Sequence, residues 1–148
     1  MTTLQNEITI IATAEKIFNA LAEMEGLEKL DPNVKKSTLL SQIKSGIGAT
    51  RKVDMQDGKN WFEEKVTDAK QNEALSFELT ACSFPVKSLK YTYKLEKSGN
   101  GVKVSQVMAY KIKFGLLGAI LDTLMIRKQY KKGIKQFFAG LKSHVEKN

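Results

Sequence analysis

The sequence predicts an α+β fold in which a curved antiparallel sheet of about seven strands wraps around one long C-terminal helix. Between residues 34 and 113, apolar and polar residues mostly alternate with a period of two, as in strands that bury one face. After Phe114-Gly115 the period becomes helical and stays so almost to the C-terminus. The links between the alternating segments are short, which makes sequential strands antiparallel neighbours, and the long helix is the only predicted element large enough to cover the sheet.

Length and composition indicate one folded domain spanning residues 1–148. Hydrophobic residues make up 42% of the chain and charged residues 27%, which is ordinary for a globular protein. The N-terminus lacks a basic stretch followed by an apolar run, and no segment approaches the roughly eighteen apolar residues of a membrane span. We therefore expect a soluble cytoplasmic protein. The single cysteine, Cys82, excludes an internal disulfide and a thiolate-rich metal site.

The chain is basic, with 24 Lys and Arg against 16 Asp and Glu, for a net charge of +8. This charge is compatible with RNA, an anionic membrane or an acidic ligand. All the basic residues except Arg51 and Arg127 are lysines, and they are spread along the chain. Because no platform of aromatic and arginine residues is evident, nucleic acid is not an expected partner, whereas transient contact with an anionic membrane stays open. The oligomeric state is left open.

The first elements are a strand and two short helices. Residues Leu4–Ile11 alternate as a strand, and Thr13 is placed to cap a helix over Ala14–Met24. A second short helix is expected over Leu27–Leu30, ending before Asp31-Pro32 because the residue that precedes a proline is pushed out of the helical region.

Six further strands, joined by turns rich in glycine and polar residues, complete the predicted sheet. They are Val34–Ile43, Ala49–Met55, Asn60–Ala69, Ala74–Ser83, Ser88–Glu96 and Val102–Lys113.

The final helix carries one apolar stripe, with lysines on its other faces. The stripe consists of Leu117, Ile120, Leu121, Leu124, Tyr130, Ile134, Phe137, Phe138, Leu141 and Val145. Gly133 and Gly140 interrupt this helix, which indicates a bend or a close approach to another backbone. The apolar segment Phe114–Leu121 has three interpretations: an ordinary helix start packed on the sheet, a flexible lid, or a surface that dips into a membrane.

The predicted hairpin at Gln56–Lys59 places Arg51 opposite Glu64, and Val53 opposite Phe62, on the inward face. An arginine and a glutamate buried together form a self-consistent pair. Two interpretations stay open. The pair either joins two strands, or Arg51 releases Glu64 and offers its donors to a ligand carboxylate.

Polar groups also interrupt the apolar inner face of the later strands. Across the Gly99–Gly101 hairpin we predict four opposed pairs: Leu95 with Val102, Tyr93 with Val104, Tyr91 with Gln106 and Leu89 with Met108. Leu75, Phe77, Leu79 and Ala81 are expected inward on the preceding strand. Such a mixture suits a pocket that holds an apolar body and orients a polar head, or else aromatic rings that simply pack under the helix.

The case for catalysis is thin. The sole histidine, His144, lies in the last turns of the final helix and is expected to be exposed. No serine or cysteine nucleophile can be placed beside a histidine, and no residues have metal-ligand or phosphate-loop spacing, so neither a metal nor a cofactor is expected. A cyclase needs only a shaped pocket with an acid or base, which Glu64, Arg51 and a tyrosine are able to supply.

Four short motifs stand in order along the chain: Ile10–Phe18 (IIATAEKIF), Gly46–Arg51 (GIGATR), Asp57-Gly58 and Trp61–Val66 (WFEEKV). With the order of elements, they resemble the START-like superfamily of polyketide cyclases and dehydrases, plant pathogenesis-related allergens and lipid-transfer domains. The resemblance implies a helix-grip fold with a hydrophobic ligand between sheet and helix. One departure is the absence of a tryptophan that many bacterial relatives show on the last strand, near Gln106 or Met108, so the cavity lining is expected to differ.

We therefore predict a non-enzymatic protein that binds or transfers a small hydrophobic or amphipathic molecule, such as a lipid, fatty acid or polyketide-like compound. The alternative is a polyketide cyclase or dehydratase that uses the same cavity. The predicted ligand-binding residues are Arg51, Val53, Phe62, Glu64, Phe77, Leu79, Tyr91, Tyr93, Gln106, Met108, Tyr110, Leu121 and Leu124.

Overall fold

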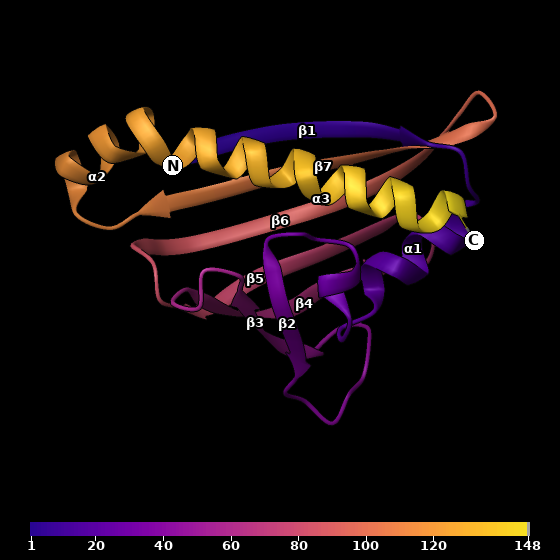
Figure 1. Cartoon of the computed structure of the whole chain (residues 1–148), viewed down its shortest axis with the longest axis horizontal. Coiled ribbons are helices and arrows are strands. Elements are labelled where there is room, and N and C mark those ends of the chain that lie inside the picture. Colours follow the sequence, from indigo (N-terminus) through magenta and orange to yellow (C-terminus); the bar gives the residue numbers. More distant parts are fainter. Residues whose placement is uncertain (148) are drawn as a thin grey trace.

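The computed structural model describes residues 1–147 and shows a seven-stranded antiparallel sheet with a long C-terminal helix lying across one face (Figure 1). The strands are β1 (Thr2–Ile10), β2 (Val34–Leu39), β3 (Thr50–Met55), β4 (Trp61–Lys70), β5 (Ala74–Cys82), β6 (Val86–Ser98) and β7 (Gly101–Ile112). Their order across the sheet is β1-β7-β6-β5-β4-β3-β2. The predicted fold class is confirmed.

Strands β2 to β7 form a meander, and β1 joins it from the far side by pairing with β7. The sheet therefore has two edges, one at β1 and one at β2. Leu4 and Ile10 of β1 face the core, in agreement with the predicted alternation.

One short helix and one helical turn follow β1, where the sequence predicts two short helices. Helix α1 (Ala14–Ala22) begins as predicted at Thr13, whose side chain accepts a hydrogen bond from the backbone N–H of Lys16. Its residues Ile17, Phe18 and Leu21 are buried. The second element, η1 (Leu27–Lys29), is a single 3-10 turn. The space between Gly26 and Pro32 is too short for a longer helix, because the chain must turn at both residues.

The β3–β4 hairpin has the predicted register. Arg51 lies opposite Glu64, and Val53 lies opposite Phe62. The hairpin ends with a hydrogen bond from the Met55 N–H to the Asn60 carbonyl. Period-two alternation and a correctly placed turn were enough to define both the partners and the inward face.

The predicted register of the β6–β7 hairpin is wrong by two residues. Leu95 pairs with Val104, Tyr93 with Gln106, Tyr91 with Met108 and Leu89 with Tyr110. The strands run up to a two-residue turn at Gly99-Asn100, closed by Ser98 and Gly101, whereas the prediction centred the turn one residue earlier. Because the side-chain period is two, the same residues still face the core.

The prediction that Ala81 faces inward at the end of β5 is wrong, because the pairing of β4 with β5 contains a bulge. The register shifts between Glu63 and Glu64, so Ala81 pairs with Glu63 and Cys82 pairs with Phe62. The extra residue moves Ala81 off the inner face, and the half-buried Cys82 packs against the core in its place.

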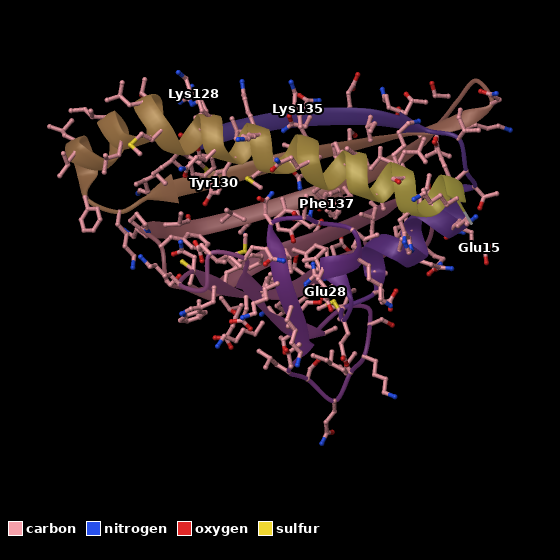
Figure 2. All side chains as sticks on the ribbon, viewed as in Figure 1. Glu15, Glu28, Lys128, Tyr130, Lys135 and Phe137 are labelled. Carbon is pink, nitrogen blue, oxygen red and sulfur yellow. The ribbon has the colours of Figure 1, made fainter. Side chains whose placement is uncertain are left out.

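The long C-terminal helix is continuous from residue 115 to residue 147 but contains a π-helical segment. It consists of α2 (Gly115–Leu121), the π segment η2 (Asp122–Ile126) and α3 (Arg127–Lys147). Figure 2 shows Tyr130 and Phe137 on the side of α3 that faces the sheet and Lys128 and Lys135 on the opposite side. Within residues 1–147, no helix is both long and apolar enough to cross a membrane.

The two glycines of α3 differ in their surroundings. A Cβ atom at Gly140 would lie 1.7 Å from the Leu30 carbonyl oxygen, so this glycine permits the predicted close approach to another backbone. A Cβ atom at Gly133 would meet nothing within 4 Å. Gly133 therefore leaves space open instead of allowing close packing.

The first part of the predicted apolar stripe is not buried. Leu117, Ile120 and Leu124 are exposed, whereas Ile134, Phe137, Phe138, Leu141 and Val145 are buried. Figure 1 shows α2 at the end of the molecule opposite the C-terminus, at the limit of the sheet. The interpretation of Phe114–Leu121 as a helix start packed on the sheet is therefore wrong for Phe114, Leu116, Leu117 and Ile120, whereas Leu121 is half-buried.

Candidate functional site

A cavity of about 850 Å³ lies between the sheet and the C-terminal helix. Its floor consists of side chains from β3 to β7, and its roof comes from Leu121, η2 and the first half of α3. Apolar side chains dominate the wall: Leu27, Met55, Phe62, Leu79, Phe84, Val86, Leu89, Met108, Leu121, Met125, Ile126, Ile134 and Phe137. Gly133 also lines the cavity, and the missing side chain adds to its volume.

The structure brings most of the predicted ligand-binding residues to this cavity. The lining includes Arg51, Phe62, Glu64, Leu79, Tyr91, Tyr93, Gln106, Met108 and Leu121. Four others, Val53, Phe77, Tyr110 and Leu124, lie outside the lining. That any lining residue binds a ligand remains a prediction.

The four residues outside the lining have other surroundings. Val53 is fully buried between neighbouring strands, and Leu124 is 64% exposed on the outside of η2. Phe77 lies behind the wall, where its ring stacks on Tyr91 with centroids 5.1 Å apart and contacts the Arg51 guanidinium at 4.9 Å. Tyr110 is buried beyond the cavity and donates a hydrogen bond to Asp122.

Arg51 and Glu64 form a buried ion pair in the cavity wall. The Arg51 Nε and Nη2 atoms lie 2.8 Å and 2.7 Å from Glu64 Oε2, and Nη1 donates to the Glu23 carbonyl at 3.3 Å. Both side chains are almost inaccessible to solvent. Burial lowers the pKa of Arg51, but the Glu64 carboxylate, its hydrogen bond and the nearby tyrosines Tyr91 and Tyr93 together outweigh burial and raise the pKa, so the arginine stays charged.

Tyr91 completes the network. Its hydroxyl donates a 2.6 Å hydrogen bond to Glu64 Oε1, the oxygen that Arg51 leaves free. Burial, reinforced by the Glu64 charge, raises the pKa of Tyr91 well above its ordinary value. The phenol is therefore protonated at neutral pH and acts as a donor to Glu64.

Tyr93 and Gln106, cross-strand partners on β6 and β7, add polar groups beside this network. Burial also raises the pKa of Tyr93, which keeps its hydroxyl neutral. Gln106 is buried, and its Oε1 atom accepts no hydrogen bond from any residue of the described chain. An unpaired buried acceptor costs free energy. Asn6 of β1, the cross-strand neighbour of Gln106, likewise has a buried Nδ2 atom without a hydrogen-bond partner among the described residues.

The polar residues at the cavity mouth were not predicted from the sequence. We define the mouth by the lining residues that are also exposed: Gln56, Asp57, Asn60, Ser83, Met125, Gln129 and Lys132. Next to it, Asn33 Nδ2 donates to Gln136 Oε1 at 2.8 Å and so joins the β2 entry to α3. Most of these residues lie in turns or on the polar side of the helix, where periodicity carries no signal. Asp31 also lines the cavity, and burial raises the pKa of its carboxyl.

A second missed feature is the buried carboxylate of Asp122, at the start of the π segment. Its Oδ2 accepts a 2.6 Å hydrogen bond from Thr2 Oγ1 and lies 3.5 Å from Arg127 Nη2, and its Oδ1 accepts one from the Tyr110 hydroxyl. Burial alone would raise the pKa of Asp122, but these hydrogen bonds outweigh burial and lower it. The cluster fastens η2 to β1 and β7. In the sequence, the feature that could have indicated this cluster is a single acidic residue within an otherwise apolar and basic segment.

His144 does not belong to the cavity lining. It is half-buried within α3 instead of exposed, next to residues of α1 and η1.

A family described as polyketide cyclase / dehydrase and lipid transport matches residues 1–146. No curated protein matches the chain in sequence. The chain is similar in structure to a START superfamily protein from Mycobacterium smegmatis, with a TM-score of 0.80 and 14% identity over 98% of this chain and 97% of the other. It is also similar to Ara h 8.0201, with a TM-score of 0.80 and 19% identity over 99% of each chain, and to TTHA0849 from Thermus thermophilus, with a TM-score of 0.81 and 16% identity over 97% of each. Structural likeness at such low identity concerns the fold, but the family match covers nearly the whole sequence. The chain therefore belongs to the polyketide cyclase / dehydrase and lipid transport family.

Proposed function

We propose that this protein binds a small amphipathic molecule in the cavity between sheet and helix and transfers it. The observation that carries the proposal is the cavity itself: about 850 Å³, walled mainly by apolar side chains and with a few convergent polar groups at one side. Binding sites for small molecules typically have volumes of roughly 300–1,000 Å³ and this kind of lining. The family description, which includes lipid transport, supports the same function.

Two observations support a neutral, hydrogen-bonding head group over a carboxylate. The Arg51 donors are engaged by Glu64 and the Glu23 carbonyl, so an incoming carboxylate has to displace a buried counter-charge. Gln106 Oε1 has no donor among the described residues, so a ligand hydroxyl or amide N–H that reaches it gains a hydrogen bond that a carboxylate cannot donate. We therefore propose that a long-chain alcohol or phenol binds more tightly than the acid of equal length.

Native mass spectrometry of the protein purified from its own cells, followed by denaturing extraction, tests the function. A stoichiometric hydrophobic compound is the expected result. Titration with a fatty alcohol and a fatty acid of the same length then tests the head-group class. An empty protein that binds neither probe contradicts the proposal.

The helix offers a matched pair of variants for this test. Gly133→Phe directs a ring into the cavity and is expected to abolish probe binding. Ala139→Phe adds the same ring on an exposed position of α3 and is expected to leave binding unchanged. Equal loss of binding in both variants indicates that the probe does not occupy the cavity.

A second candidate function is a cyclase or dehydratase reaction, favoured by one observation. Glu64 and Tyr91 are hydrogen-bonded to each other in the cavity wall and supply a base and a hydroxyl donor. If the protein is an enzyme, the Glu64→Gln and Tyr91→Phe variants are each expected to retain bound ligand but to lose turnover. If it is a carrier, there is no turnover to lose. Incubation of the extracted ligand with wild-type protein, followed by mass analysis, distinguishes the two functions.

A further inference from the structure

A protein that transfers an apolar cargo needs a surface from which to receive it. The largest exposed apolar side chains of the C-terminal helix gather on α2 and η2. We define the apolar patch as Phe114, Leu116, Leu117, Ile120 and Leu124, of which Leu116 is 88% exposed. Figure 2 shows the side chains of this end of the molecule extending away from the sheet. Exposed apolar groups clustered in this way mark interaction surfaces, whereas single exposed leucines do not.

Basic residues flank the patch in the sequence. Lys111 and Lys113 precede it, and Arg127, Lys128 and Lys131 follow it, all exposed. Between Lys111 and Val145 the only acidic residue is Asp122, which is buried and hydrogen-bonded in the cluster with Thr2 and Tyr110. The exposed surface contributed by this segment is therefore apolar and cationic, without acidic side chains.

The patch continues into the cavity. Leu121 lines the cavity, and Met125 both lines it and is 54% exposed at the mouth. Leu124, next in the chain to Met125, belongs to the patch. An apolar molecule therefore meets no charged side chain of η2 between the patch and the cavity, because the one acid of this segment is buried against β1 and β7.

We propose that the apolar patch docks on an anionic membrane surface and that cargo passes between that membrane and the cavity past Met125. Apolar side chains with adjacent lysines and arginines are the features that hold an amphipathic helix at the boundary between head groups and acyl chains. Anionic lipid complements the basic residues, whereas a second copy would bring two cationic segments together. The passage of cargo rests on the proposed function, but the docking does not.

Flotation with two kinds of vesicle tests the docking. Wild-type protein is expected to float with vesicles of phosphatidylcholine and phosphatidylglycerol, at least about tenfold more than with phosphatidylcholine alone, and to be released as salt rises. Absence of binding to the anionic vesicles overturns the proposal.

Matched variants locate the contact. The double variant Leu116→Asp/Leu117→Asp is expected to lose vesicle binding, whereas Leu40→Asp/Ile47→Asp is expected to retain it, because it places the same two charges on exposed apolar positions between β2 and β3. Likewise, Lys128→Glu/Lys131→Glu is expected to lose binding and Lys90→Glu/Lys94→Glu to retain it. Equal losses in patch and control variants indicate a response to net charge and overturn the assignment of the patch.

Two further outcomes are separable. Analytical sedimentation tests whether the patch holds a dimer instead. If the wild type is a dimer that does not bind vesicles, and Leu116→Asp/Leu117→Asp is a monomer, the patch mediates self-association and membrane docking is overturned. Native mass spectrometry without vesicles reports on the cavity alone. A protein that carries ligand but does not bind vesicles rejects this inference and leaves the proposed function supported. A protein that binds vesicles but carries no ligand supports the docking and rejects the proposed function.

Discussion

Arg51 directs two donors at a single oxygen of Glu64 and leaves the other oxygen to Tyr91. Nε and Nη2 both meet Oε2, at 2.8 Å and 2.7 Å, while the Tyr91 hydroxyl meets Oε1 at 2.6 Å. Every oxygen of the buried carboxylate is therefore hydrogen-bonded, and the positive charge beside the cavity is balanced. The polar side of the cavity is a preassembled unit contributed by β3, β4 and β6.

Removal of the Glu64 charge is expected to destabilise the fold strongly. Glu64→Gln leaves a buried guanidinium without a counter-charge, and the loss is expected to be about 3–5 kcal/mol in the free energy of unfolding. Urea denaturation at neutral pH measures it. The double variant Arg51→Met/Glu64→Leu is expected to recover most of this loss because no unpaired charge remains. A Glu64→Gln protein as stable as the wild type contradicts the ion-pair assignment.

Tyr91→Phe is expected to lower the free energy of unfolding by about 1.5–3 kcal/mol, the usual contribution of a hydrogen bond to a charged group. The aromatic stack on Phe77 is kept because only the hydroxyl is removed. A double-mutant cycle with Glu64→Gln, read from urea denaturation, is expected to give a coupling energy above about 0.5 kcal/mol. Strict additivity argues against the hydrogen bond.

Alanine at the two helix glycines is expected to act in opposite directions. Gly133→Ala gains up to about 1 kcal/mol of stability, since alanine favours the helix and the added methyl group meets open space. Gly140→Ala is expected to lose about 1–3 kcal/mol, because its Cβ cannot share space with the Leu30 carbonyl and the backbone must shift. Thermal unfolding of the two variants side by side makes the comparison, and a stabilised Gly140→Ala contradicts it.

The contribution of Asp122 is expected to depend on pH. Its pKa is lower in the folded protein than in the unfolded chain, so its stabilisation is complete above the ordinary aspartate pKa of about 3.9 and is lost as pH falls through the folded value. Asp122→Asn is therefore expected to cost about 1–3 kcal/mol at pH 7 and progressively less below about pH 4. Urea denaturation of both proteins across this range measures the difference. A constant difference argues against titration of Asp122.

Inner and outer faces of the strands were predictable because one rule, alternation with period two, governs most of the sheet. Arg51 and Glu64 were paired correctly since the turn between them was placed correctly. The same rule tolerated the register error at Tyr91, because a shift of two keeps the face. It failed at Ala81, where a bulge changes the count by one residue.

The polar site residues that escaped prediction lie mostly in turns or on the polar side of the helix, where periodicity carries no signal. Asn33 and Asn60 lie in turns that tertiary packing brings to the cavity. Leu124 fitted the apolar stripe, but α2 and η2 lie at the limit of the sheet, and a helical pattern does not reveal where the covering surface ends. Cavity volume likewise depends on Gly133, where the sequence predicts a bend or a close approach to another backbone and the structure instead leaves open space.

Strand β1 is synthesised before the other described strands, and among residues 1–147 it pairs only with β7, which begins at Gly101. At roughly 5–20 residues per second, synthesis of the intervening segment occupies several seconds. Throughout that interval Leu4 and Ile10 lack the strand that later buries them, and the meander grows with an unfilled edge. Nascent chains that stall before Gly101 therefore leave β1 unpaired, with Leu4 and Ile10 on its core-facing side, and an unpaired strand of this kind favours aggregation.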